Sequence, residues 1–175
     1  MELAPRAQRQ IIRRMEPLEP PALHQAQAAY GWLELGNVEE AFAELQRLPE
    51  ELQLLPAVQA VRLDCLMAAK DWNAAVKLAQ VLCGQWAEEP GLWLHHAYAA
   101  RRYAGGSIEA AYELLAPCVE RFPEEWLVPY NVACYLCQME RLDEARAMLE
   151  MARAKGGERV DAMAKDDEDL APLNL

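Results

Sequence analysis

Apolar residues recur along the chain at helical spacing, and one apolar pattern occurs four times. Between residues 142 and 155, Ala145, Leu149 and Ala152 fall at i, i+4 and i+7, which places them on one face of a helix. The equivalent upstream positions are Ala41, Leu45 and Leu48; Ala75, Ala79 and Leu82; and Ala111, Leu115 and Cys118. The leading alanines are 34, 36 and 34 residues apart. A period of this length indicates an array of repeated helical units.

Each of these helices is preceded by a turn and by another apolar helix. In the fourth unit Val132, Leu136 and Met139 form the apolar stripe of the preceding helix, and Glu140-Arg141 is the hinge. The upstream turns are predicted at Gly36-Asn37, Lys70-Asp71 and Gly105-Gly106-Ser107. Asn37 with Glu40 indicates a capping box, and Asp71 is a suitable N-cap. The 36-residue interval requires two extra residues, either in the loop at 84–91 or at the double glycine.

Length and composition favour a single all-α domain. The chain has 175 residues, is sparse in glycine, and has no stretch that alternates apolar and polar residues over the length of a strand. We divide it into an N-terminal arm (1–21), four repeats (22–157), and a C-terminal capping helix with an acidic tail (158–175). The arm carries four arginines before Pro17 and is either a docking segment or a frayed terminus.

The fourth unit carries a family resemblance. Residues 130–133 (YNVA) followed by 142–145 (LDEA), with Phe122-Pro123 where the preceding unit ends, resemble the tetratricopeptide repeat, and the resemblance covers about residues 22–155. It implies a right-handed α-solenoid of about four helix-turn-helix repeats with terminal capping helices. It is much less specific for function, because these repeats bind very many partners.

In such an array the first helix of each repeat lines the concave side, so the resemblance directs attention to one face of those helices. The residues expected to form a peptide-binding groove there are Gln27, Tyr30, Asp64, Trp93, His96, Tyr103, Tyr130, Asn131, Cys134 and Gln138. Aromatic side chains would hold side chains of a bound peptide, and Asn131 would fix its register. The alternative is that these aromatic rings pack between adjacent repeats.

These features favour a non-catalytic protein-interaction module that binds an extended peptide or a partner helix. One subset of the family binds acidic chaperone tails through Lys, Arg and Asn; only Asn131 matches that pattern, so we do not expect such a ligand. The net charge of −11 favours a neutral or basic protein partner over nucleic acid or an anionic membrane. Self-assembly into a homo-oligomer, and a role as chaperone for a secreted substrate, are the alternatives.

The cysteines and histidines do not form a predicted catalytic or metal site, and no cofactor is expected. Cys134 and Cys137 have C-x-x-C spacing but lie in mid-helix without two further ligands, so we interpret them as core residues. His95 and His96 are adjacent, which turns their rings about 100° apart on a helix. Five cysteines, no secretion signal and no long apolar run favour a cytoplasmic protein.

The acidic tail, DDEDLAPLNL at 166–175, allows two interpretations. In one, the tail is a linear motif offered to a partner. In the other, Leu170, Leu173 and Leu175 dock back on the last helices while the acidic residues stay solvated, and we favour this second interpretation.

Overall fold

The computed structural model describes residues 18–174, and every regular element among them is a helix. Most of the predicted N-terminal arm, residues 1–17, and the last leucine of the tail lie outside these residues. None of the described helices combines the length and the apolar character needed to cross a membrane. The chain divides between His95 and His96 into two compact units, which are described separately: an N-terminal unit (18–95) and a C-terminal unit (96–174).

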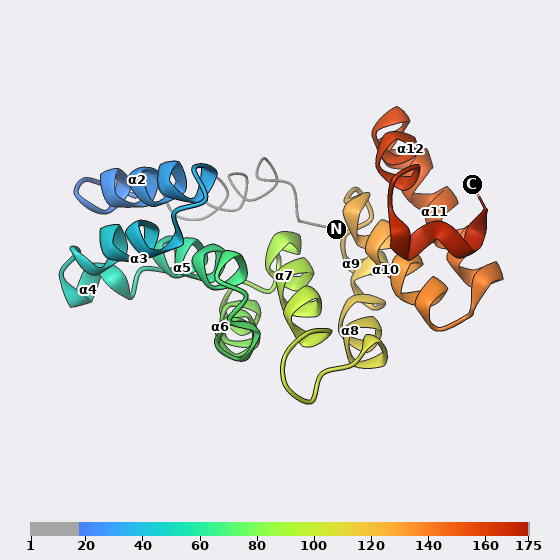
Figure 1. Ribbon diagram of the computed structural model, residues 1–175, viewed down its shortest axis with the longest axis horizontal. Helices are drawn as coiled ribbons and strands as arrows, with labels where there is room; N and C mark the ends of the chain where they lie inside the picture. The colour runs from blue at the N-terminus through green and yellow to red at the C-terminus, as the bar shows by residue number, and fades with distance from the viewer. Residues whose placement is uncertain (1–17, 175) are drawn as a thin grey trace. The chain divides into compact units, whose positions relative to one another are not determined.

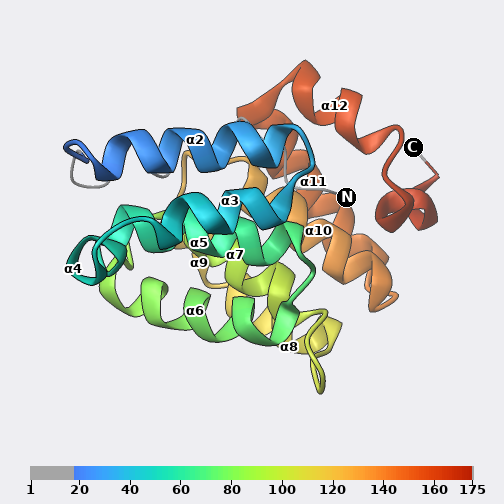
Figure 2. The ribbon, with the colours of Figure 1, turned by 60° about the vertical axis from the view of Figure 1, so that its left-hand side comes forward.

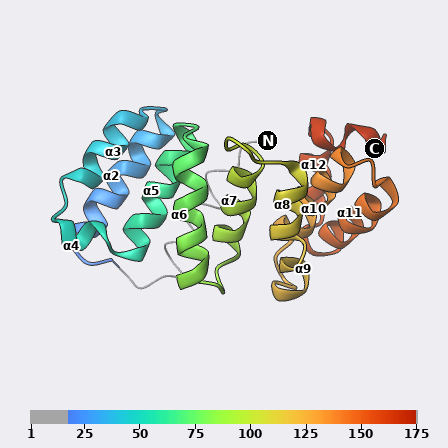
Figure 3. The ribbon, with the colours of Figure 1, turned by 90° about the horizontal axis from the view of Figure 1, so that it is seen from below.

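The N-terminal unit consists of antiparallel helix pairs. Its elements are α2 (Ala22–Glu34), α3 (Val38–Gln46), the short α4 (Glu50–Gln53), α5 (Pro56–Ala68), α6 (Trp72–Gln85) and the first residues of α7 (Pro90–Ala100). Helix α2 packs against α3, and α5 packs against α6 (Figure 3). Both α2 and α3 also contact α5, so the first pair is joined to the second by direct packing (Figure 2).

The C-terminal unit contains the remainder of α7 and six further elements: α8 (Ile108–Leu115), α9 (Cys118–Arg121), α10 (Leu127–Gln138), α11 (Leu142–Gly156), α12 (Glu158–Ala164) and the 3₁₀ helix η1 (Glu168–Leu173). Helix α10 packs against α8 on one side and α11 on another. The chain then turns through α12, which packs on α11, and η1 returns to lie against α10 and α11 (Figure 1). The end of the described chain therefore covers part of α10.

The four recurrences of the apolar pattern all face the interior. Each of the twelve predicted positions is buried, and none is more than 4% exposed. The small alanines that lead each set are 0% exposed, which agrees with close packing of the helix pairs. One detail differs: Pro117 interrupts the third set, so α8 ends at Leu115 and Cys118 opens α9 instead of continuing the same helix.

The turns between α2 and α3, between α5 and α6, and between α10 and α11 share one shape. Both predicted N-caps are confirmed: the Asn37 Oδ1 accepts from the Glu40 amide at 3.3 Å, and the Asp71 Oδ1 accepts from the Ala74 amide at 3.1 Å. The Asn37 amide donates to the Trp32 carbonyl at 2.9 Å and not to the Glu40 side chain, so the second bond of the predicted capping box is not made. The residue before the N-cap is left-handed in three turns, with φ of 75° at Gly36, 57° at Lys70 and 60° at Glu140. Lys70 and Glu140 adopt a backbone conformation that glycine accepts without steric cost.

The two extra residues of the 36-residue interval lie at the double glycine. Helices α5 and α7 begin 34 residues apart, so the loop at 84–91 adds nothing to the period. Residues 101–107 connect α7 to α8, whereas three residues suffice in each of the other helix pairs. In this longer turn a Cβ on Gly106 would lie 2.1 Å from the Ala100 carbonyl oxygen, so the backbone path requires glycine there.

Candidate functional site

The ten residues predicted to form a groove fall into two sets. Gln27, Tyr30, Asp64 and Trp93 belong to the N-terminal unit, and His96, Tyr103, Tyr130, Asn131, Cys134 and Gln138 belong to the C-terminal unit. In the first set the structure brings Tyr30 and Asp64 into contact. In the second, it brings Tyr130, Cys134 and Gln138 against the returning tail.

The contact in the N-terminal unit is a buried polar cluster that joins three helices. The Tyr30 hydroxyl on α2 donates to Asp64 Oδ2 on α5 at 2.7 Å. His95 on α7 places its Nε2 2.9 Å from Asp64 Oδ1, within the distance of an ion pair. The His95 Nδ1 lies 2.6 Å from the Gly91 carbonyl oxygen. Asp64 and His95 are 3% and 2% exposed, so this cluster is inside the unit and does not face a ligand.

The surroundings of His95 favour its charged form. A carbonyl oxygen only accepts, so the Nδ1 facing Gly91 carries a proton, and the Nε2 facing a carboxylate carries the other. Burial by itself lowers the pKa of His95, but the hydrogen bond and charge of Asp64 and the Gly91 carbonyl together outweigh burial and raise it. This ion pair is not apparent from the sequence, in which the adjacent His95 and His96 suggest only candidate metal ligands.

The other two predicted residues of the N-terminal unit do not join that cluster. The Trp93 Nε1 donates to the Ala87 carbonyl at 2.8 Å, which fixes the ring of this half-buried side chain against the loop before α7. Gln27 is exposed on α2. Trp93 therefore has a structural contact of its own, as in the alternative interpretation of the aromatic residues.

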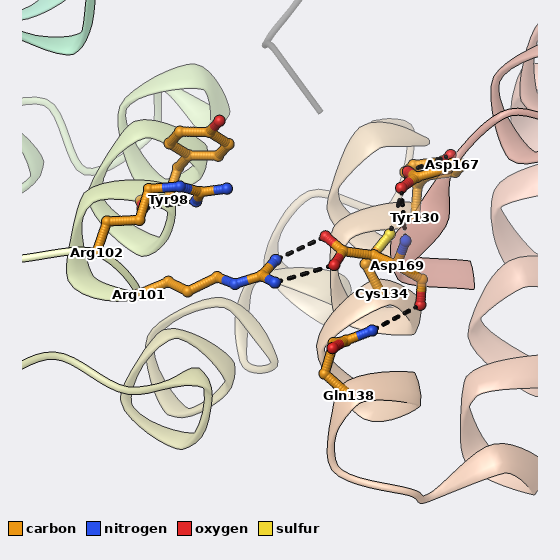
Figure 4. Close-up of polar contacts among 8 residues, drawn as sticks. All are labelled: Tyr98, Arg101, Arg102, Tyr130, Cys134, Gln138, Asp167 and Asp169. Carbon is orange, nitrogen blue, oxygen red and sulfur yellow. Dashed lines mark hydrogen bonds and ion pairs between the residues drawn. The ribbon is translucent and has the colours of Figure 1, made fainter. Parts of the chain in front are cut away.

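In the C-terminal unit, the face of α10 that carries Tyr130, Cys134 and Gln138 holds the tail through side-chain contacts (Figure 4). The Tyr130 hydroxyl donates to Asp167 Oδ2 at 2.8 Å. Farther along the helix, the Gln138 Nε2 donates to the main-chain oxygen of Asp169 at 3.2 Å. We call these three α10 residues, together with Arg101, the tail site.

Arg101, just beyond the end of α7, makes the strongest contact of the tail site. Its Nη1 lies 2.6 Å from Asp169 Oδ2 and its Nη2 lies 2.9 Å from Asp169 Oδ1, so the guanidinium donates two parallel hydrogen bonds to the carboxylate (Figure 4). Both side chains are 19% exposed, and the Arg101 hydrogen bonds lower the pKa of Asp169. The neighbouring Arg102 instead stacks on the Tyr98 ring, 3.5 Å from its centroid.

Two leucines complete the docking of the tail. Leu170 and Leu173 are 1% and 2% exposed, and the Leu173 carbonyl accepts from Arg146 at 3.1 Å. The sequence-based expectation that these two leucines dock back is confirmed, but the expectation that the acidic residues stay solvated is wrong for Asp167 and Asp169. The reason is that arginine and tyrosine donors lie within reach of their carboxylates once η1 has formed.

Tyr130 and Asn131 are less accessible than a groove residue should be. The Tyr130 ring is 0% exposed, and burial followed by the hydrogen bond to Asp167 raises the pKa of its hydroxyl. Asn131 is 3% exposed, and its amide donates to the Leu127 carbonyl of its own helix at 2.8 Å. The accessibility that the register-fixing role of Asn131 requires is therefore absent: its buried amide donates within its own helix, and Gln138 contacts the tail backbone.

Cys134, the neighbouring Cys137 and the predicted residues His96 and Tyr103 are buried or half-buried. Burial raises the pKa of the Cys134 and Cys137 thiols, and the Cys134 Sγ lies 3.7 Å from Asp167 Oδ2. His96 is 8% exposed, and burial lowers its pKa; Tyr103 is half-buried. Within residues 18–174, no group of three or more His, Cys, Asp or Glu side chains is arranged to hold a metal ion.

The tail site presents donors where its ligand presents acceptors. Arg101, Tyr130 and Gln138 all donate to the tail, and the sequence analysis missed Arg101, Asp167 and Asp169. The Arg-Arg pair at 101–102 and the D-x-D-L-x-x-L spacing at 167–173 were the available signals. No protein-family model matches this chain, and no curated protein matches its sequence.

Proposed function

We propose that this protein is a non-catalytic protein-interaction module that binds a short segment of a partner protein on the tail site. The observation that carries the proposal is the recognition of residues 167–173 by side chains of α10 and by Arg101. A surface that holds one short helical segment through a defined set of donors has the chemistry to hold another.

The fold that we propose around this site is a right-handed α-solenoid of four tetratricopeptide-like repeats with terminal capping helices. It is supported by the burial of the repeated apolar positions and by the packing of α2 on α3, α5 on α6, and α10 on α11. The left-handed turns at Gly36, Lys70 and Glu140 also recur at equivalent places within these pairs.

We further propose a cytoplasmic location, without nucleic acid, membrane or cofactor as partner. All five cysteines are free and buried, which suits a reducing compartment. The net charge of −11 opposes binding to polyanions over the surface as a whole.

Selection from a random-peptide library tests the proposed function, because such a library requires no named partner. The unaltered protein is compared with Arg101→Gln, which removes the charge of the tail site but keeps most of the side-chain stem. Arg159→Gln, at an exposed position on α12, is the matched control for the loss of one positive charge. Thermal unfolding of each protein shows that the fold is retained.

We expect peptides that bind the unaltered protein and Arg159→Gln, and that bind Arg101→Gln at least tenfold more weakly. If no peptide is enriched, or if the enriched peptides bind all three proteins equally, the tail site is not a binding surface. Recovery of segments of this chain together with concentration-dependent sedimentation would instead favour the self-assembly alternative.

A further inference from the structure

We infer that the partner segment is acidic and contains leucines, in the form Asp-x-Asp-Leu-x-x-Leu. Residues 167–173 of this chain occupy the tail site and compete with the partner segment for it. This inference rests on the proposed function and names the ligand class of the same site. It differs from the expectation drawn from net charge, which favours neutral or basic partners for the protein as a whole.

The polar half of the site selects carboxylates. Arginine has five donors and no acceptor, so Arg101 is satisfied only by acceptors, and its two parallel contacts match the two oxygens of a carboxylate. The Tyr130 hydroxyl donates to a second carboxylate two residues earlier, that of Asp167. A basic residue at the Asp169 position would place a like charge against Arg101, and one at the Asp167 position would offer the Tyr130 hydroxyl no acceptor. The spacing Asp-x-Asp is therefore set by the distance between Arg101 and Tyr130 across the site.

The apolar half of the site selects the leucines. Side chains at i and i+3 of a 3₁₀ helix lie on the same side, so Leu170 and Leu173 enter the interior together while Ala171 and Pro172 remain exposed. The packing of η1 on both α10 and α11 surrounds these leucines with helix side chains. The two intervening residues, Ala171 and Pro172, are exposed, so the proposed motif leaves their identity open.

Arginines lie at the site although the protein as a whole is acidic. Arg101 and Arg146 both donate to the tail, and Arg102 follows Arg101 directly in the chain. Charges farther away than about 10 Å are largely screened at physiological ionic strength. An approaching acidic segment therefore responds to these arginines more than to the net charge of −11.

The tail is held by contacts that an equivalent segment can replace. Its one element, η1, spans six residues, and 3₁₀ hydrogen bonds are weaker than those of an α-helix. Asp167 also caps η1, since its Oδ1 accepts from the Asp169 amide at 3.1 Å. A tethered segment of this kind competes at an effective concentration in the millimolar range. A partner segment consequently binds more weakly to the unaltered chain than to one whose own tail is loosened.

The test uses a fluorescein-labelled peptide with the sequence of residues 165–175, measured by fluorescence anisotropy. It is titrated into the unaltered protein and into the double variant Asp167→Asn, Asp169→Asn, which loosens the protein's own tail while leaving Arg101, Tyr130 and Gln138 in place. The matched control protein carries Asp166→Asn and Glu168→Gln, which remove two exposed acidic groups from the same segment. Far-ultraviolet circular dichroism verifies the fold of each protein.

We expect the peptide to bind the loosened variant at least tenfold more tightly than the unaltered protein, and the control protein to behave like the unaltered one. A peptide with asparagine at both aspartate positions should bind the loosened variant at least tenfold more weakly. Equal binding to all three proteins, or no binding to a folded loosened variant, would overturn the inference. If library peptides still depend on Arg101 in that case, the interaction module stands and only its acidic ligand class falls.

A second measurement uses the unaltered chain alone. Excess peptide is added, and amide hydrogen exchange of residues 167–173 is followed by mass spectrometry. Faster exchange confined to this segment supports its displacement, whereas unchanged exchange with bound peptide would place the peptide elsewhere and overturn the inference.

The oligomeric state of the loosened variant distinguishes a partner from a second copy of this chain. If the loosened variant forms dimers that the peptide dissociates, the occupant is the tail of a second copy, and the partner assignment is overturned.

Discussion

The pH dependence of stability should change when Asp64 becomes asparagine. The substitution is nearly isosteric, but it removes the charge that holds His95 in its protonated form within a buried cluster. The folded-state pKa of His95 is raised, so the ion pair contributes fully below the ordinary histidine value of about 6.5. Its contribution is lost as the pH rises through the higher folded-state pKa.

The magnitude follows from the kind of contact that is lost. A buried hydrogen bond to a charged group contributes about 1.5–3 kcal/mol, so Asp64→Asn should lower the free energy of unfolding by about 2 kcal/mol at pH 6. Each unit by which the folded-state pKa exceeds the ordinary one corresponds to about 1.4 kcal/mol. The difference between the unaltered protein and Asp64→Asn should therefore shrink between pH 6 and pH 8.

Urea unfolding followed by circular dichroism at pH 6, 7 and 8 measures this difference. Tyr30→Phe is the matched control, because it removes a neutral donor to the same carboxylate, at 2.7 Å, without touching His95. It should cost about 1.5 kcal/mol at every pH, because the acceptor is a charged carboxylate. A cost of Asp64→Asn that is constant or grows between pH 6 and pH 8 would refute the assignment of a charged His95.

Two further predictions concern the turns and the thiols. Lys70→Gly and Glu140→Gly should each raise the free energy of unfolding by about 0.5–1 kcal/mol, because both residues have positive φ; a lower urea midpoint would contradict this. The five buried thiols should react with a thiol reagent only after unfolding, and burial raises the pKa of Cys65 to about 12. The free energy of unfolding should accordingly fall as the pH rises past the ordinary thiol pKa of about 8.5, because the exposed thiols of the unfolded chain ionise there and the buried ones do not. Rapid reaction of the folded protein with the reagent, or a constant free energy of unfolding above that pH, would refute the burial argument.

The sequence predicted those parts of the fold that depend on local spacing. Ala41, Ala75, Ala111 and Ala145 are buried because a helix presents every third or fourth residue to the same side. The caps at Asn37 and Asp71 were equally predictable, since an N-cap side chain bonds an amide only three residues away.

The candidate site was harder to predict because its contacts join distant parts of the chain. Arg101 and Asp169 are 68 residues apart, and no periodicity within either segment indicates that they meet. The sequence predicts a groove-facing helix stripe that includes Tyr130, yet Tyr130 is buried and its hydroxyl donates to Asp167. The 3₁₀ helix that follows Asp167 has six residues and is too short to give a periodic signal. Of the ten predicted groove residues, Tyr130, Cys134 and Gln138 contact the tail, but the accessibility predicted for Tyr130 and Cys134 is wrong, because both are buried.

The position of η1 over α10 also has a kinetic consequence. A segment that uses Arg101 and Tyr130 cannot form its contacts while Asp169 and Asp167 hold them, so opening of the tail must precede productive association. The observed association rate should then level off as ligand concentration rises, at a ceiling equal to the rate at which η1 leaves. Under the proposed mode of binding, any change that hastens the departure of η1 would raise that ceiling, and the association rate at high ligand concentration would be set by η1.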